Sequence, residues 1–472
     1  MKKQIITLAI AGAMSLALPS GLMAQDSALT SDMIEHAKMI GEKALNSTLT
    51  EEIITSLTTE VGHRLAGSAN DVKGREWAIN KMTAMGYDKV WTEPVTIPLW
   101  HRGTASARIT APFAHNMAIT ALGNSVRTPE GGLTAEIVQF DEYKDLVAAP
   151  EGSLDGKIAY VSFRMEDSGV AGAKGYGYAG QARRNGSVAA AKAGASAIII
   201  RSIGTDDNRT PHTGSMNYAD GVTQIPAAAI SNPDADLLDN VLKHGKPVTI
   251  ELNLTSHSHD PVVTYNVIGE ITGSDEPDKA VLIGAHLDSW DLAMGALDDG
   301  TGVAIVMSAG KHIIDGGVKP KRSIHVILFA AEEEGLYGAH EYVRAHKEDH
   351  NDFGQTILGA EWDSGTGRII NLEPGVGPTS LTVMREIGAV LAPYGVATLM
   401  TNGAKGQSDM SALGNAGMPA VNLGMEKTNY FDYHHTPNDT LDKVDIPAIT
   451  FNSSIYAMFA FMAASVDVDY MK

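Results

Sequence analysis

The chain has 472 residues, of which 44% are hydrophobic and 19% are charged, a composition typical of folded globular proteins and not of disordered chains. Its formal net charge of −20 repels phosphate backbones, which argues against nucleic-acid binding. No cysteine is present, so disulfides and thiolate ligands are excluded and any metal must be bound by His, Asp and Glu.

The first 24 residues have the features of a secretory signal peptide. Lys2 and Lys3 give a positively charged start, and residues 5–18 form an apolar run that is short for a membrane span. The small residue Ala24 marks the expected cleavage site. The alternative is an uncleaved anchor helix. We therefore expect an exported protein, periplasmic or secreted, with no membrane segment once residues 1–24 are removed.

A chain of this length exceeds what one hydrophobic core usually spans, so two domains are expected. In residues 25–125, the first part of a catalytic domain, apolar residues recur at helical spacing, and a strand at 90–97 is confined to a sheet edge by Pro94. From 126 to 258, short β-like runs alternate with a Gly/Ala-rich helical stretch. This segment is predicted to be a smaller β-rich or α/β domain inserted into the catalytic one.

Residues 259–472, the second part of the catalytic domain, alternate between apolar runs of strand length and helical stretches. This rhythm predicts an α/β fold with a mostly parallel central sheet and helices on both faces. The clearest buried strands are 280–285, 324–331 and 357–361.

Each of these three strands ends in residues that bind metals well. His286 and Asp288 follow the first strand, Glu332 and Glu333 the second, and Asp363 the third. Ligands of open α/β sheets bind beyond the carboxyl ends of the strands. We therefore expect these side chains to meet at one rim of the sheet.

Two more such residues lie at element ends: Asp298 at the start of a predicted helix, and His435 in a polar loop. Taken singly, each of these residues is more often a local hydrogen-bonding group, a helix cap or part of a solvated turn. Their joint occurrence in this chain order favours a metal site. Imidazole and carboxylate donors suit zinc first, and cobalt or manganese would fit the same donors.

Binding of two cations would give each of the five candidate ligands a role in coordination. Two ions about 3.5–4 Å apart need a bridging carboxylate to offset their repulsion, and Asp298 suits that position. One Zn²⁺ would then take His286 and Asp363, and the other would take Glu333 and His435.

Two acids beside the ligands are left for other roles. Asp288 lies two residues after His286 and would accept its second imidazole N–H, which fixes the ring. Glu332 is not needed for coordination, so it is the candidate general base.

The motifs, in their order along the chain, resemble those of the co-catalytic di-zinc aminopeptidase superfamily, which includes bacterial aminopeptidases and glutamate carboxypeptidase. They are HLDS at 286–289, ALDDGTG at 296–302, AEEEGLYG at 331–338, EWD at 361–363 and HTPNDT at 435–440.

Within that superfamily the chain is most similar to the carboxypeptidase Q branch, through HLDSWD at 286–291, HTG at 212–214 and the pair His434 and His435. The resemblance covers nearly all of the chain after residue 24. It implies an exported exopeptidase for dipeptides or short peptides, with two Zn²⁺ per chain, often a homodimer, and an insert of the protease-associated type.

The resemblance also singles out residues around the ligands. In many relatives a tyrosine precedes the last histidine and steadies the developing oxyanion; here His434 holds that place and Tyr433 comes one position earlier. Ser408 and Asp409 match a pocket segment, with a loop cap as the alternative. His212 is a candidate for a lid over the site, or for a structural loop residue.

The ligands do not decide which end of a peptide is removed, because they only activate water. Acids near the ions would hold a free amine, whereas carboxypeptidase action needs a basic residue, for which Arg183, Arg184 and Arg201 are candidates. Elsewhere, His257 and His259 alternate in a polar junction. We interpret that junction as a solvated linker and not as a metal tract.

Two other functions are compatible with this fold. A non-catalytic binding protein would be expected to lack ligands, and none is missing here. A single-zinc glutaminyl cyclase would hold one ion per chain, whereas this ligand set predicts two.

Overall fold

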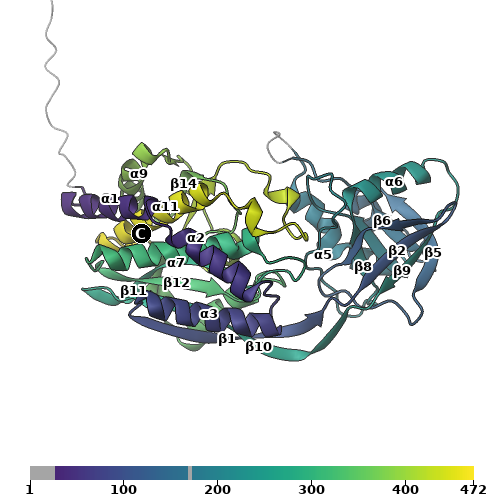
Figure 1. Ribbon diagram of the computed structural model, residues 1–472, viewed down its shortest axis with the longest axis horizontal. Helices are drawn as coiled ribbons and strands as arrows, with labels where there is room; N and C mark the ends of the chain where they lie inside the picture. Colours follow the sequence, from purple (N-terminus) through teal and green to yellow (C-terminus); the bar gives the residue numbers. More distant parts are fainter. Residues whose placement is uncertain (1–26, 168–172) are drawn as a thin grey trace, which may run out of the picture.

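The computed structural model describes residues 27–167 and 173–472, so the predicted signal peptide lies outside the described residues. The described chain forms two bodies side by side, each built on an eight-stranded sheet (Figure 1). The smaller body is inserted in the sequence between two long strands of the larger one, β1 (Lys89–His101) and β10 (His257–Ile271).

The larger sheet is mixed, with parallel strands at its centre. In spatial order its strands are β1 (Lys89–His101), β10 (His257–Ile271), β12 (Arg322–Phe329), β11 (Glu276–His286), β13 (Thr356–Glu361), β16 (Ala420–Met425), β14 (Ile369–Gly375) and β15 (Ala397–Thr398). The run from β12 to β16 is parallel. The pairs β1–β10, β10–β12 and β14–β16 are antiparallel, and β14 pairs with β15 in parallel. As predicted, the strand with Pro94 is an edge strand.

Helices cover both faces of this sheet, which explains the uninterrupted apolar strands. In β11, Val281 and Ile283 belong to one core, whereas Leu282 belongs to the core on the opposite face. The first core is covered by α1 (Ser31–Leu45), α2 (Leu49–Ser56), α3 (Ala69–Met85), α7 (Thr301–Gly316), α9 (Leu381–Leu391) and α11 (Ile446–Ser465), and the second by α8 (Tyr337–Val343) and α10 (Ser408–Asn415).

Helix α11 is the one helix in the described part of the chain that is long and apolar enough to cross a membrane. However, 83% of its apolar window is buried inside the molecule. Its composition is therefore that of a core helix, packed against α1 and α7.

The smaller sheet is also mixed. In spatial order its strands are β3 (His115–Met117), β2 (Ala105–Ala111), β9 (Thr249–Leu254), β5 (Leu133–Phe140), β6 (Ile158–Val161), β7 (Ala197–Arg201), β8 (Ala227–Ile230) and β4 (Ile119–Ala121). Strands β5 to β8 are parallel. Its helices are α4 (Tyr143–Val147), α5 (Tyr176–Lys192) and α6 (Asn232–Leu242).

The expected domain boundary at residue 126 falls inside this smaller body. Strands β2, β3 and β4 precede that residue, yet β2 pairs with β9 and β4 pairs with β8. The insert therefore begins near residue 105. A local pattern cannot reveal this, because the partner strands lie more than 100 residues further along the chain.

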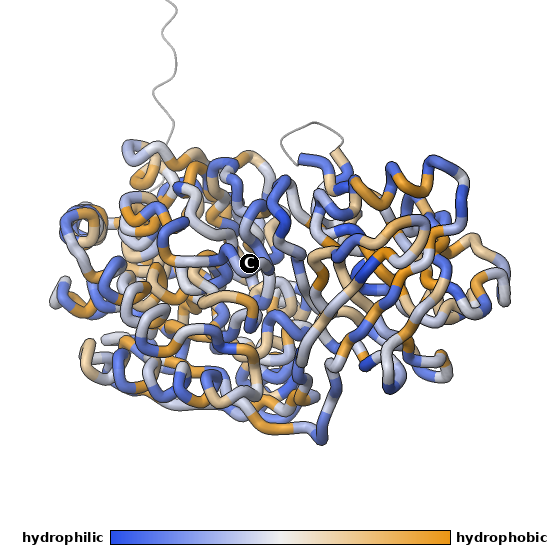
Figure 2. The backbone as a smooth tube through the Cα atoms, turned by 45° about the vertical axis from the view of Figure 1, so that its right-hand side comes forward, coloured by the Kyte–Doolittle hydropathy of each residue, from blue (hydrophilic) through white to orange (hydrophobic). Residues whose placement is uncertain are grey.

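The two bodies are joined by a long antiparallel ribbon. Strands β1 and β10 pair from Lys89 and Glu270 to His101 and His257, and they run along the lower edge of Figure 1 toward the smaller body. Hydrophobic and hydrophilic stretches are interleaved along the tube in both bodies (Figure 2), as expected where each element turns one side to a core.

Candidate metal centre

The carboxyl ends of β11, β12 and β13 lie next to one another because these strands are parallel neighbours in the larger sheet. His286 is the last residue of β11, while Glu333 and Asp363 follow shortly after β12 and β13. The sheet thus delivers one predicted ligand from each strand to the same rim, as the sequence indicated.

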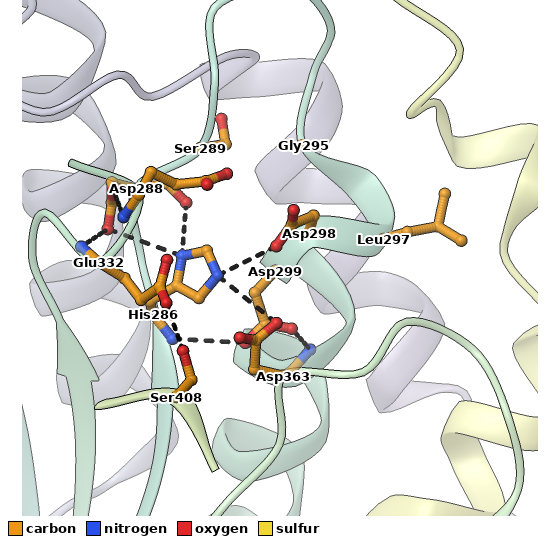
Figure 3. Close-up of polar contacts among 12 residues, drawn as sticks. His286, Asp288, Ser289, Gly295, Leu297, Asp298, Asp299, Glu332, Asp363 and Ser408 are labelled. Atoms are coloured by element: carbon orange, nitrogen blue, oxygen red, sulfur yellow. Dashed lines mark hydrogen bonds and ion pairs between the residues drawn. The ribbon is translucent and has the colours of Figure 1, made fainter. Parts of the chain in front are cut away.

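Asp298 lies between two imidazole rings. Its Oδ1 is 3.2 Å from Nε2 of His286, and its Oδ2 is 3.3 Å from Nε2 of His435. Asp363 Oδ1 lies 3.8 Å from the same His286 nitrogen, and Glu333 Oε2 lies 2.9 Å from the same His435 nitrogen. The five predicted ligands therefore converge as two groups that share Asp298, and Figure 3 shows the group around His286.

The donor set fits cations. Glu333 Oε1 and Asp298 Oδ2 are buried and have no hydrogen-bond partner in the described part of the chain. Burial raises the pKa of Glu333 well above its usual range, and the charges of Asp298 and Glu332 add to the shift. Burial likewise raises the pKa of Asp299 and Glu361. Bound cations would offset this buried negative charge, and the nitrogen and oxygen donors suit zinc.

A small cavity adjoins this cluster. It is lined by Asp298, Glu333 and His435 together with Trp290 and Asp439, among others. The ring of Trp290 meets the His435 ring edge-on, with centroids 5.8 Å apart.

Asp288 connects the loop after β11 to the loop after β12. Its two carboxylate oxygens accept the backbone N–H groups of Glu332 at 3.1 Å and Glu333 at 3.2 Å. His286 Nδ1 lies 3.1 Å from the Asp288 carbonyl oxygen and 3.6 Å from its carboxylate. Asp288 therefore positions both the imidazole and the neighbouring acids.

Glu332 faces the centre without forming an ion pair to either histidine in the described structure. Its Oε1 accepts a hydrogen bond from the Ser408 hydroxyl, and burial raises its pKa to about 7. Asp409 is fully buried next to Ser408, and burial raises its pKa, with the charges of Glu361 and Glu332 adding to the shift.

Backbone strain is concentrated at the same place. Ala331, Ser408 and His435 have φ values of 57°, 41° and 61°, in the left-handed region that disfavours non-glycine residues. Each such residue costs about 1–3 kcal/mol unless its surroundings fix it, and strained residues cluster at functional sites.

Arg64 is a positioning residue that the sequence analysis did not identify. Its fully buried guanidinium donates hydrogen bonds to the carbonyl oxygens of Leu287 (2.6 Å), Met294 (2.7 Å) and Gly295 (3.1 Å), and of Gly62 (2.9 Å). Leu287 follows His286 in the chain, and Gly295 lies shortly before Asp298. Arg64 therefore fixes the backbone beside both ligands. The only sequence signal was the polar, glycine-marked loop at 61–68.

Asp439 is a second such residue. Its carboxylate accepts the backbone N–H groups of Leu297 at 2.6 Å and Asp298 at 3.3 Å, so it fixes the segment that carries the shared ligand. It lies within the HTPNDT motif, which could have marked it.

The aromatic residues that precede His435 in the chain lie in different environments. His434 stacks on His435, with ring centroids 3.5 Å apart, and its Nε2 lies 3.6 Å from Asp298 Oδ2. The Tyr433 hydroxyl accepts a hydrogen bond from Asn429 at 3.0 Å. Tyr430, which the sequence analysis missed, packs against His434 with ring centroids 5.1 Å apart; burial raises its pKa, and the charges of Asp298, Asp363 and Glu333 raise it further.

The smaller body contributes to the centre from the opposite side. The Thr213 carbonyl oxygen is 3.2 Å from Nδ1 of His435, and Arg183 Nη1 is 3.4 Å from the same nitrogen. His212, next to Thr213, is buried, and its Nε2 lies 2.5 Å from Asp206 Oδ2. His212 thus holds the loop that reaches His435, and within the described residues it forms no ion pair with the ligands themselves.

Of the three candidate arginines, only Arg183 reaches the centre. Arg201 forms ion pairs with Asp236 and Asp239, both at 2.7 Å, inside the smaller body. Arg184 donates to the Gly177 carbonyl oxygen. Arg183 donates to the Tyr176 hydroxyl at 2.7 Å and forms no ion pair with a carboxylate of the described residues.

This sheet, with His and acidic side chains gathered at the carboxyl ends of its parallel strands, is consistent with a metallopeptidase, and comparison with known proteins establishes that class. The family model for peptidase family M28 matches residues 266–460. Human carboxypeptidase Q is 33% identical over 419 residues, which cover 88% of this chain and 85% of the human protein. The chain therefore belongs to peptidase family M28.

Solved structures agree with this assignment. A peptidase M28 precursor from Shewanella amazonensis is 47% identical, with a TM-score of 0.89 over 93% of this chain and 98% of that one. A zinc aminopeptidase from Bacillus subtilis shares the fold, with a TM-score of 0.64 and 20% identity over 90% of this chain and 98% of that one. The predicted α/β fold, the resemblance to carboxypeptidase Q and the enzyme class, an exopeptidase of the metallopeptidase type, are confirmed; a protease-associated identity of the insert stays a prediction.

Replacing Asp288 by Asn tests its positioning role. Asn offers one acceptor where the carboxylate offers two, so one of the N–H groups of Glu332 and Glu333 loses its partner. Changes to groups that orient metal ligands typically cost about 10–100-fold in metal affinity or activity. We expect a loss of this size in zinc affinity, measured by competition with a chelator. Asp278→Asn, at an exposed carboxylate, is the control; equal affinities in the two variants would contradict the role.

Proposed function

We propose that the chain is an exported exopeptidase that uses two zinc ions to hydrolyse dipeptides or short peptides, with Glu332 as the general base. The observation that carries the proposal is the shared carboxylate of Asp298, which presents one oxygen to His286 and the other to His435. A bridging acid between two single-histidine groups is what a pair of cations requires.

The two ions would be held by His286 and Asp363 on one side and by Glu333 and His435 on the other, with Asp298 between them. When bound, such ions supply Lewis-acid activation of water and of the scissile carbonyl. Zinc is supported by the donor types and by the zinc aminopeptidase among the structural neighbours.

The surroundings of Glu332 support a role in proton transfer. It lies next to a ligand and keeps its carboxylate free of the histidines, while the Ser408 hydroxyl fixes its orientation. In the proposed reaction it takes a proton from the attacking water and passes it to the nitrogen of the departing amine.

The surroundings of the centre are closely packed. The cavity beside Asp298, Glu333 and His435 is small and partly enclosed. The smaller body faces the centre through Thr213 and Arg183. An end of a peptide fits such a space better than the middle of a long chain. The relative named carboxypeptidase Q and the aminopeptidases among the neighbours support this substrate class without deciding which end is removed.

Glu332→Gln separates metal binding from catalysis. The amide keeps the shape and the hydrogen bond from Ser408 but cannot take a proton. We expect kcat to fall by about 10²–10⁴-fold on dipeptides with free and with blocked amino ends, while the zinc content stays equal to that of the wild type, with two ions at the candidate metal centre.

Glu348→Gln, at an exposed position, should leave both quantities unchanged. An active Glu332→Gln enzyme would refute the assigned role. One ion at the candidate metal centre of the active wild-type chain would instead favour the single-zinc alternative.

Tyr430, and not Tyr433, is the tyrosine we propose for oxyanion stabilisation. Its ring packs against that of His434 beside the centre, with centroids 5.1 Å apart, and the charges of Asp298, Asp363 and Glu333 add to the burial that raises its pKa. Tyr430→Phe should lower kcat by about 10²–10³-fold, as the loss of one oxyanion donor does in other enzymes. Tyr433→Phe, which removes only the contact to Asn429, should stay within about twofold. The reverse ranking in steady-state kinetics would assign the role to Tyr433.

Export is proposed from the N-terminal sequence and from the similarity to the Shewanella protein, which is described as a precursor. The full-length chain, expressed in a Gram-negative host, should be recovered from the periplasmic fraction or the medium beginning at Gln25. Intact-mass measurement would show the loss of residues 1–24. A cell-associated chain that retains Met1 would contradict this part of the proposal.

A further inference from the structure

Three histidines lie together on the ribbon that joins the two bodies, and none of them belongs to the candidate metal centre. His257 and His259 are two residues apart on β10, so they point to the same face of the ribbon. His101 lies directly opposite His257 on β1, and its neighbour Leu99 lies two residues away, opposite His259. In antiparallel strands, directly opposite residues share a face, so all three rings share one.

The three rings converge. Ring centroids are 5.5 Å apart for His101 and His257, 4.7 Å for His101 and His259, and 4.6 Å for His257 and His259. One nitrogen from each ring lies within 4.8 Å of the others. Around one zinc ion at about 2.0–2.1 Å, tetrahedral geometry places ligand nitrogens roughly 3.4 Å apart. Small side-chain rotations would therefore bring one nitrogen of each ring to coordination distance of a single ion.

The nitrogens are available for coordination. His257 Nδ1 lies 3.1 Å from the Thr255 carbonyl oxygen. Because a carbonyl only accepts, Nδ1 carries the proton and Nε2 is left with its lone pair. A backbone carbonyl holding one ring nitrogen while the other binds metal is a common arrangement for histidine ligands.

The rings are also free of competing carboxylates. In the described part of the chain, none of the three histidines forms an ion pair with a carboxylate. The nearby Asp291 is itself paired with Arg102 at 2.6 Å. His101 and His259 are exposed, so an ion can enter and a water molecule can complete its coordination.

We propose that His101, His257 and His259 bind a third divalent cation of the zinc class, outside the candidate metal centre. Three imidazoles without a carboxylate or thiolate suit zinc, copper or nickel and disfavour calcium and magnesium. The interpretation of His257 and His259 as a solvated linker is thereby revised, because the third ring comes from a strand more than 150 residues away in the sequence.

The position of the trio gives the ion a structural consequence. His101 ends β1 and His257 begins β10, at the two points where the chain crosses between the bodies. Just beyond them the crossing segments pair through Thr104 and Thr255. An ion bound by the three histidines would link the two crossing segments. It would thereby restrain the orientation of the smaller body relative to the candidate metal centre.

Zinc content per chain tests the site directly. Tag-free, full-length protein is dialysed against micromolar ZnCl₂, and its zinc content is measured by inductively coupled plasma mass spectrometry. We expect His101→Ala and His259→Ala each to hold one zinc ion fewer than the wild type, and His244→Ala, at an exposed histidine of the smaller body, to hold the same number. The rise in thermal midpoint on adding ZnCl₂ should be smaller in the two trio variants than in the control.

The outcome does not depend on the proposed function. Asp298→Asn disturbs the candidate metal centre and should retain the ion at the trio, whereas His101→Ala should retain peptide hydrolysis. Equal zinc content in the wild type and in folded His101→Ala and His259→Ala would overturn the proposal and leave three ordinary solvated rings. If one trio variant fails to fold, the other one decides.

Discussion

Asp298 presents one carboxylate oxygen to each of two buried histidines, and the rest of the larger body holds it there. The Asp439 carboxylate accepts a hydrogen bond from the Asp298 backbone N–H. Arg64 donates hydrogen bonds to the carbonyl oxygens of Leu287 and Gly295, which lie close to His286 and Asp298 in the chain. Glu333 and Asp299 add further buried acids whose pKa burial raises. So much negative charge is unfavourable in a protein interior unless cations balance it.

The two bodies meet at this centre. The larger body supplies the ligands from the ends of its parallel strands, and the smaller body supplies the Thr213 carbonyl and the Arg183 guanidinium beside His435. The ribbon of β1 and β10 sets the distance between the bodies. Residues far from the ligands, on that ribbon, can therefore influence the space in which a substrate is held.

Much of this arrangement could be predicted from the sequence because the chemistry lies at the ends of apolar strands. His286, Glu333 and Asp363 each follow a run that is buried on both faces, and parallel pairing brings such ends together. What could not be predicted depends on contacts distant in the sequence. The insert begins near residue 105 because β2 pairs with β9. Arg64 acts through carbonyls more than 200 residues away, and His101 meets His257 and His259 only through strand pairing.

The central claim is that a pair of zinc ions lies on either side of the Asp298 carboxylate. X-ray diffraction from crystals of the zinc-loaded protein, collected just above and below the zinc absorption edge, tests it most directly. The account predicts two anomalous peaks about 3.5–4 Å apart, one beside His286 and Asp363 and the other beside Glu333 and His435. A single peak at this position, or none within bonding distance of Asp298, would contradict it.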